Sequence, residues 1–245
     1  MTDDITLAAR RRTRAVVAAV AAVVLIVVAV VGVLVATVGR WGNPAPAPPT
    51  ATAETAAPAG PQAGPTSPAA LQWVTVAGAH LPAGADGPRD TSAGRARGFA
   101  HTAMGAVFAA AHITVRLSPQ AGPGVYEPTF REQVVGPDTN RLLAAVDEEY
   151  QQLRAQFGVA PGEPAGQLYS TVTSYRIGAA SPDAVEVGLL IEGPSQSGPT
   201  RIALTVQMRW VSNDWALQAP SRGDWNTAAV LVQSTAGYAG FPAGG

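Results

Sequence analysis

The sequence predicts a protein of the α+β class, with a single N-terminal transmembrane helix followed by one folded domain. Three observations support this prediction: a long uncharged run near the N-terminus, apolar residues at helical spacing in the middle of the chain, and apolar residues at every second position towards the C-terminus. Because the helical patterns precede the strand patterns, we expect about three helices packed on a curved antiparallel sheet.

Residues 15–38 form the predicted transmembrane helix. The run carries no charged residue and no proline, and at about 1.5 Å per residue it covers the hydrocarbon core of a bilayer, about 30 Å thick. Four arginines within residues 10–14 precede the run, whereas only Arg40 follows it. This bias predicts a cytoplasmic basic tail, residues 1–14, and a C-terminal domain outside the cell membrane. A signal peptide would have a shorter apolar core, although Ala51-Thr52-Ala53 leaves late cleavage open as an alternative.

Residues 39–70 are predicted to be a disordered stalk. The stretch is rich in Pro and Ala and has few large apolar side chains that could nucleate a core. Pro-rich chain favours the extended polyproline II conformation, so the stalk would be a semi-stiff spacer of at most about 80–90 Å. It separates the membrane from residues 71–245, which we expect to form the exported α+β domain with a loosely structured C-terminal tail.

The first helix of the domain is predicted to begin after Thr102, a residue type that caps helix N-termini. Its apolar residues recur at spacings of four, three and four, which places them on one face: Met104, Phe108, Ala111 and Val115. A short second helix is predicted to begin at Pro128 and to stop at Gly136-Pro137, with Phe130 and Val134 on one face.

The third helix has the clearest pattern. Asp138 or Thr139 is expected to cap its N-terminus, and Gly158 is expected to end it. The apolar stripe of this helix is predicted to consist of Leu143, Val146, Tyr150, Leu153 and Phe157.

After the helices the apolar period changes to two, which is typical of half-buried strands. The predicted strands are Gln72–Val76 before the helices, then Tyr169–Ala179, Ala184–Glu192, Arg201–Val211 and a return strand containing Trp215 and Leu217. In the strand that starts at Arg201, the residues expected to face inwards are Ile202, Leu204, Val206, Met208 and Trp210. The hairpin that follows would bring Trp210 and Trp215 together.

Composition excludes several classes of function. A formal net charge of −1 argues against a nucleic-acid partner, and the lack of cysteine excludes thiolate metal sites, catalytic thiols and disulfides. The histidines are His80, His101 and His112. If helical, the last two lie about 16 Å apart, too far to share a metal ion. We expect His101 to fix the start of the helix and His112 to lie at the edge of its apolar stripe.

No recognised catalytic motif occurs in the sequence. Acid–base chemistry inside the domain would have to use Asp147 and one of three tyrosines, Tyr150, Tyr169 or Tyr175. These residues have no diagnostic spacing, and Tyr150 belongs to a core stripe. Arg209 is expected on the solvent face of its strand. We therefore assign no catalytic, cofactor-binding or metal-binding residue and predict no cofactor.

Two segments carry a family resemblance. They are Gly98-Phe99-Ala100-His101-Thr102, leading into Gly105-Ala106-Val107, and the hairpin Met208-Arg209-Trp210-Val211-Ser212-Asn213-Asp214-Trp215. The chain resembles, from Leu71 to Phe241, a family of membrane-anchored proteins of actinobacterial integrative and conjugative elements. The resemblance implies a cone-shaped exported domain like nuclear transport factor two, a fold also found in the inner-membrane scaffold subunits of conjugative type IV secretion systems.

This resemblance implies a non-enzymatic scaffold or docking subunit of a conjugative apparatus. Such a subunit spans the membrane once and binds protein partners in an envelope complex, a homo-oligomer being one form that it could take. Two alternatives stay open from the sequence. One is binding of a small apolar ligand, or acid–base catalysis, in the cone cavity; the other is an accessory protein of a lipid importer.

The orientation of the chain gives a first prediction. Protease added to intact spheroplasts should digest the region from Leu71 onwards, because the arginine bias places the N-terminus in the cytoplasm. Immunoblotting with antibodies against the domain measures the loss. Full protection of the domain, under conditions in which a known external protein is digested, would show that the orientation is reversed.

Overall fold

The computed structural model describes residues 71–195 and 198–241. The predicted tail, transmembrane helix and stalk, residues 1–14, 15–38 and 39–70, lie outside the described residues. The α-helices of the described part are α2 (Ala103–Arg116), α3 (Pro123–Gln133) and α4 (Thr139–Phe157). Within these described ranges, no helix is both long and apolar enough to cross a membrane.

The predicted α+β class is confirmed. The strands are β1 (Gln72–Val76), β2 (Ala79–Ala83), β3 (Val134–Val135), β4 (Thr171–Ser181), β5 (Ala184–Ser195), β6 (Gly198–Val211), β7 (Asp214–Gln218), β8 (Ala229–Leu231) and β9 (Ala239–Gly240). Strands β1 and β2 form a separate hairpin, and the others form a seven-stranded sheet of order β3-β7-β6-β5-β4-β9, in which β8 also pairs with β6. Only the short β3 pairs in parallel, with β7; the other pairs of the described sheet are antiparallel.

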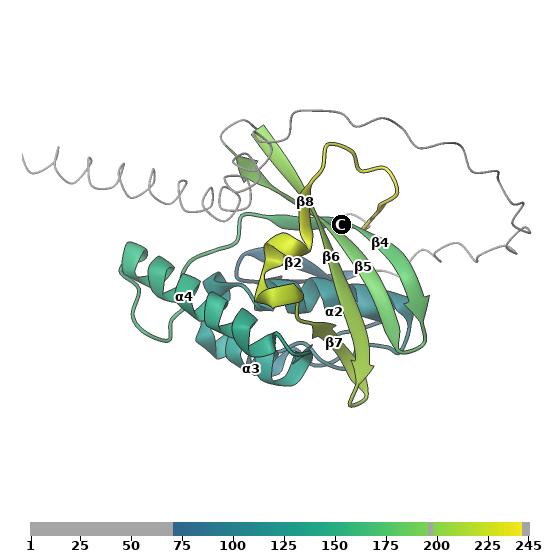
Figure 1. Ribbon diagram of the computed structural model, residues 1–245, viewed down its shortest axis with the longest axis horizontal. Coiled ribbons are helices and arrows are strands. Elements are labelled where there is room, and N and C mark those ends of the chain that lie inside the picture. Colours follow the sequence, from purple (N-terminus) through teal and green to yellow (C-terminus); the bar gives the residue numbers. More distant parts are fainter. Residues whose placement is uncertain (1–70, 196–197, 242–245) are drawn as a thin grey trace, which may run out of the picture.

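Helix α2 is the centre of the core, because it lies against the inner face of the sheet and contacts β4, β5, β6 and β7 (Figure 1). As predicted, Thr102 is the N-cap, and its side chain accepts a hydrogen bond from the Gly105 N–H. The helix is more buried than its stripe indicated: the whole run of residues 105–113 is buried.

The predicted start of the second helix is wrong. Helix α3 begins at Pro123, and Pro128 lies inside it. Pro123 and Pro128 both suit a first helical position. The start at Pro123 gives the longer helix, which buries Tyr126 as well as Phe130. The helix ends at Gln133, so Val134 belongs to β3, where its pairing with Leu217 of β7 replaces helical hydrogen bonds.

Helix α4 has the predicted bounds, with Gly158 as its C-cap. Asp138 occupies the N-cap position, although its side chain makes no capping hydrogen bond and instead pairs with Arg141 at 3.2 Å. The predicted stripe is shifted at both ends. Leu142 is buried in place of Leu143, and Phe157, in the last turn beyond the core, is 38% exposed. The residues that bury the face of α4 are Leu142, Val146, Tyr150 and Leu153.

The strand pattern is confirmed, with changes at the ends of the strands. The first strand, β1, has the predicted bounds, whereas β4 starts two residues after the predicted Tyr169, and both β5 and β6 extend further into their shared hairpin. In β6, Leu204, Val206 and Met208 are buried, and Arg209 is exposed. The period of two therefore assigned the inner face of this strand correctly.

The C-terminal segment, expected as a loosely structured tail, contributes strands at both edges of the sheet. β8 pairs with β6, and β9 pairs with β4 at Ser174 and Tyr175. Between these strands Tyr238 lies over Gly188 of β5 and beside Arg176 of β4. Phe241 then packs on Tyr175, with ring centroids 4.9 Å apart. The segment thus crosses the outer face of the sheet and ends in the core.

The two segments that carry the family resemblance contact each other directly. The carboxylate of Asp214 accepts hydrogen bonds from the N–H groups of Gly98, at 2.8 Å, and Phe99, at 3.2 Å. The Trp215 indole N–H donates to the carbonyl of Ala100 at 2.9 Å. A Cβ at Gly105 would overlap that carbonyl, so only glycine allows the loop to lie this close to the start of α2.

The predicted contact of Trp210 with Trp215 is confirmed. Their rings are in an edge-to-face arrangement with centroids 5.3 Å apart, which is a favourable geometry for aromatic pairs. The ring of His101 stacks on Trp210 at 4.0 Å and also meets Trp215 at 5.9 Å. Trp215 is 1% exposed, whereas Trp210 is only half-buried.

This difference in burial gives a second prediction. Trp215→Ala should lower the free energy of unfolding by about 3–5 kcal/mol, because it removes a buried indole and its hydrogen bond. Trp210→Ala should cost less, and Arg209→Ala, on the exposed face, should stay within about 0.5 kcal/mol. Urea unfolding of the full-length chain in detergent, followed by circular dichroism, measures the three values. Equal losses for Trp215→Ala and Arg209→Ala would contradict the register of the hairpin.

Candidate functional site

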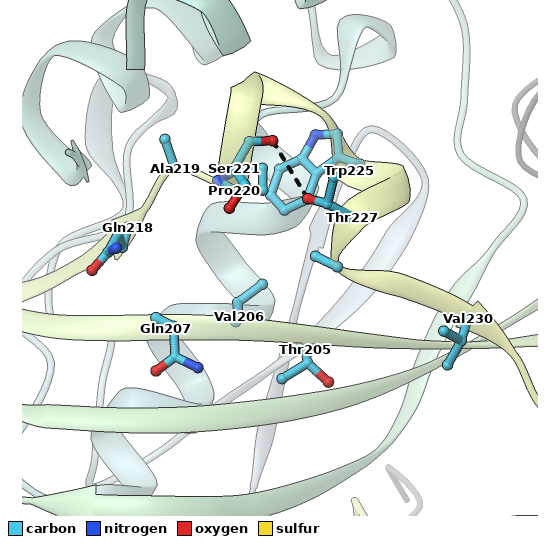
Figure 2. Close-up of a pocket in the computed structure, with 11 residues that line it drawn as sticks. Thr205, Val206, Gln207, Gln218, Ala219, Pro220, Ser221, Trp225, Thr227 and Val230 are labelled. Atoms are coloured by element: carbon cyan, nitrogen blue, oxygen red, sulfur yellow. Dashed lines mark hydrogen bonds between the residues drawn. The ribbon is translucent and has the colours of Figure 1, made fainter. Parts of the chain in front are cut away.

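A pocket of about 390 Å³ opens at the edge of β6, in the gap between β7 and β8 (Figure 2). Both strands pair with the same edge of β6: β7 opposite residues 207–211 and β8 opposite residues 202–204. Between them, residues 219–228 leave the sheet and form two 3-10 helices, η3 (Ser221–Gly223) and η4 (Trp225–Thr227). This excursion creates the pocket.

The excursion is held at three points. The Thr205 N–H donates to the carbonyl of Ala228 at 2.8 Å, which brings the chain back to β6. Asp224 caps η4 by accepting from the Asn226 N–H at 2.9 Å. Gly223, with φ of +65°, lies so close to the backbone of Leu142 in α4 that a Cβ would clash there. These contacts fix Trp225 beside the pocket.

The side chains that line the pocket contain no ionisable group. They are Thr205, Val206, Gln207, Gln218, Ala219, Pro220, Ser221, Trp225, Thr227, Ala228 and Val230. Figure 2 shows Trp225, Pro220 and Ser221 on one side of the β6 ribbon and the side chains of Thr205 and Gln207 on the other. The pocket therefore offers an apolar wall, amides and hydroxyls, but no general acid or base.

Two charged neighbours orient the pocket amides. Gln207 donates through Nε2 to Glu186 at 2.9 Å, and Gln218 accepts through Oε1 from Arg209 at 3.1 Å. Gln207 and Gln218 are register partners on β6 and β7, so their side chains project from the same face of the sheet. The amide atoms outside these two bonds are the acceptor Oε1 of Gln207 and the donor Nε2 of Gln218.

The residues considered from the sequence lie outside this pocket. His112 is fully buried, not at the edge of a stripe. Its Nε2 lies 2.9 Å from the carbonyl of Pro82, and its Nδ1 lies 2.8 Å from Nη1 of Arg116. The guanidinium can only donate, so Nδ1 accepts and the Nε2–H donates to Pro82. Burial and the charge of Arg116 lower the pKa of His112 to about 3, which keeps the ring neutral.

Arg116 completes this buried group. It is 2% exposed and also donates through Nε to the carbonyl of Gly94 at 3.1 Å. Burial lowers the pKa of Arg116 to about 10, so the guanidinium stays charged at neutral pH. It bonds to His112 and to this carbonyl, and His112 bonds to Pro82, so the group ties α2 to β2 and to the loop before the helix.

Asp147 and Tyr150 also make structural contacts. Asp147 accepts from the Tyr126 hydroxyl at 2.7 Å, and burial, followed by this bond, raises the pKa of Tyr126. The Tyr150 hydroxyl donates to the carbonyl of Glu163 and accepts from the N–H of Gly162, both at 3.0 Å. These bonds connect α4 to α3 and to the loop that follows α4, and they satisfy the polar ends of buried rings.

The other candidates are dispersed. His101 donates through Nε2 at the β4–β5 turn, to the Pro182 carbonyl at 2.8 Å and to the Asp183 carboxylate at 3.0 Å. Tyr169 is 57% exposed before β4, whereas Tyr175 is buried and burial raises its pKa. His80 lies on the exposed β1–β2 hairpin. In the part of the chain that the structure describes, no three His, Asp or Glu side chains form a cluster that could hold a metal ion.

Sequence reasoning did not identify the pocket. Its lining comes from three segments, and Thr205, Gln207 and Gln218 follow the strand period without any motif. The one usable signal was the run from Pro220 to Trp225, where Pro, Gly and Asp indicate a break after the return strand.

The fold and the pocket define an α+β domain with an uncharged pocket at a gap in its sheet. The chain belongs to the protein family described as a domain of unknown function, DUF8175, which it matches over residues 36–240. No curated protein matches the chain significantly. No solved structure matches it significantly either.

The buried histidine gives a third prediction. Unfolded, His112 has an ordinary pKa near 6.5, whereas the folded value is about 3. Between pH 3 and pH 6.5, His112 is protonated in the unfolded chain but neutral in the folded one, so acidification lowers the free energy of unfolding. The full contribution of neutral His112 to stability is present only above about pH 6.5. From pH 7 to pH 5 this group should contribute a loss of about 2 kcal/mol.

The measurement compares urea unfolding at pH 7 and pH 5 for the full-length protein and for His112→Gln, which cannot titrate. The variant should be less stable at pH 7, because the Nδ1 acceptor of Arg116 is lost, yet it should lose less on acidification. Identical pH dependence in the two proteins would contradict the neutral, buried state of His112.

Proposed function

We propose that the protein is a non-enzymatic, membrane-anchored component of the cell envelope, in which the exported domain docks partner subunits. By its family resemblance, the complex is a conjugative, type IV secretion-like apparatus. In this proposal residues 15–38 anchor the chain, the stalk sets the distance from the membrane, and the domain is a cone-shaped relative of nuclear transport factor two.

The observation that carries the proposal is that the acid–base candidates are engaged in structural bonds. His112 is bonded to Arg116 and Pro82, Asp147 to Tyr126, and Tyr150 to the loop after α4. Catalysis needs an acid and a base within reach of one substrate. The pocket at β6, in turn, has no ionisable lining. This arrangement favours binding over chemistry.

The segments that carry the resemblance support the same conclusion. Asp214 binds the backbone of Gly98 and Phe99, Thr102 caps α2, and His101 stacks on Trp210. Each of these side chains has a structural task, so the family pattern describes a fold rather than an active site.

The two alternative functions, acid–base catalysis and a role in a lipid importer, can be distinguished from docking in a conjugative apparatus. Acid–base catalysis inside the cone would require the buried His112 or Tyr150 to meet a substrate, but both lie within the apolar core at 0% and 2% exposure. An accessory protein of a lipid importer would share the same layout, and genes for importer subunits beside this gene would favour that function over conjugation.

Removal of the anchor gives a fourth prediction. A version that begins at Leu71 and is exported by a cleavable signal should fold but fail to restore conjugative transfer to a deletion strain. The physical reason is that anchoring raises the concentration of the domain near its partners, and this gain is lost on release. Transfer frequency is the measurement, and the full-length gene is the positive control.

The matched variants keep the anchor and change the acid–base candidates: His101→Asn, His112→Gln, Asp147→Asn and Tyr150→Phe. Each should leave transfer intact as long as the protein accumulates to normal levels. Transfer that survives loss of the anchor but collapses in one of these four variants would replace the docking proposal with a catalytic one.

A further inference from the structure

We propose that the pocket at the edge of β6 is a binding site for a neutral carbohydrate. The proposal rests on the composition of the lining, on the fixed orientation of two amides and on the position of Trp225. It goes beyond the docking function and does not depend on it, because the chemistry of the pocket is independent of membrane topology.

The lining favours a neutral ligand and suits a sugar. Five polar side chains face the pocket, and all are uncharged amides or hydroxyls: Thr205, Gln207, Gln218, Ser221 and Thr227. An anion or a cation would lose hydration there without gaining a counter-charge from the lining. A sugar ring presents hydroxyls that such groups can bind. The volume of about 390 Å³ falls within the range of small-ligand pockets, about 300–1,000 Å³.

The two glutamines provide directional recognition. Glu186 holds Nε2 of Gln207, and Arg209 holds Oε1 of Gln218, so neither amide can rotate without losing a charge-assisted hydrogen bond. The pair therefore presents an acceptor, Oε1 of Gln207, and a donor, Nε2 of Gln218, on the same face of the sheet. Such groups can bind sugar hydroxyls, and equally the N–H and C=O of an acetamido substituent.

Trp225 supplies the apolar side of the site. The indole is half-buried and packs against the core, and in Figure 2 it lies across the β6 ribbon from Thr205 and Gln207. Sugar rings have a face of C–H groups that packs on aromatic rings, while their hydroxyls point outwards. A ring in the gap, with its C–H face on Trp225, would leave its hydroxyls free for the polar groups of the lining.

An extended peptide fits less well. A peptide would bind by adding a strand to an unpaired sheet edge, but β7 and β8 already occupy the edge of β6 on both sides of the gap. Within the gap Thr205 uses its N–H for the carbonyl of Ala228. The free stretch is too short for a strand, which favours a compact ligand.

The test is isothermal titration of the full-length protein in detergent with two probes, the trimer of N-acetylglucosamine and maltotriose. Both are neutral, and only the first carries acetamido groups. Saturable binding of at least one probe is expected, with a dissociation constant in the millimolar range or below. Preference for the first assigns the glutamine pair to an acetamido group, and equal binding assigns it to hydroxyls.

Variants place the binding in this pocket. Trp225→Leu and Gln218→Leu should each weaken binding by about tenfold or more, while Trp225→Phe, which keeps an aromatic wall, should retain most of the affinity. Tyr169→Leu and Gln152→Leu change exposed residues outside the pocket and should bind like the unchanged protein. Thermal unfolding identifies variants that are folded, and only these are compared.

Three results would overturn the proposal. The first is the absence of binding of both sugars to the folded, full-length chain at millimolar concentration. The second is unchanged affinity in folded Trp225→Leu and Gln218→Leu. The third is tighter binding of a neutral peptide of Ala and Thr, displaced by neither sugar. None of these results depends on conjugative transfer, so the outcome is separate from that of the docking proposal.

Discussion

The contact between the loop before α2 and the β6–β7 hairpin depends on one carboxylate. Asp214, at the start of β7, accepts hydrogen bonds from the N–H groups of Gly98, Phe99 and Trp215, and a carboxylate has enough lone pairs to satisfy all three. These bonds hold the loop before α2 against a hairpin more than a hundred residues later in the chain. The indole of Trp215 then binds the carbonyl of Ala100. Because Thr102 follows directly and caps α2, the same contact determines where the central helix begins and how it meets the sheet.

A buried helix gains stability when the large polar side chains that it carries are paired, since an unpaired polar group in an apolar core is costly. His112 and Arg116 are paired with each other and with the carbonyls of Pro82 and Gly94. The same reasoning explains Tyr126 with Asp147, and Tyr150 with Glu163. Groups that resemble catalytic candidates in the sequence are therefore the polar connections between α2, α3, α4 and their loops. The proposed recognition site lies elsewhere, at the gap where the chain leaves β7 and returns as β8.

The sequence determined the class and most of the elements, because local periodicity and end signals report which face of an element is buried. The bounds of α4, the N-cap Thr102, the strand β1, the inner face of β6 and the Trp210–Trp215 contact all followed from such patterns. The sequence also identified the two segments that meet at Asp214, but it did not predict that they are in contact. The orientation in the membrane rests on the sequence alone.

Only the tertiary structure decided the rest, for physical reasons that no local pattern contains. The start of α3 depended on the burial of Tyr126, and the pairing of Val134 with Leu217 depended on a strand that lies far along the chain. The full burial of His112 required the sheet on one side of α2 and β2 on the other. The pocket exists because β7 and β8 share one edge of β6 and leave a gap between them. Its chemistry comes from ordinary Thr, Gln and Trp side chains, which become a site only when three separate segments place them around one space.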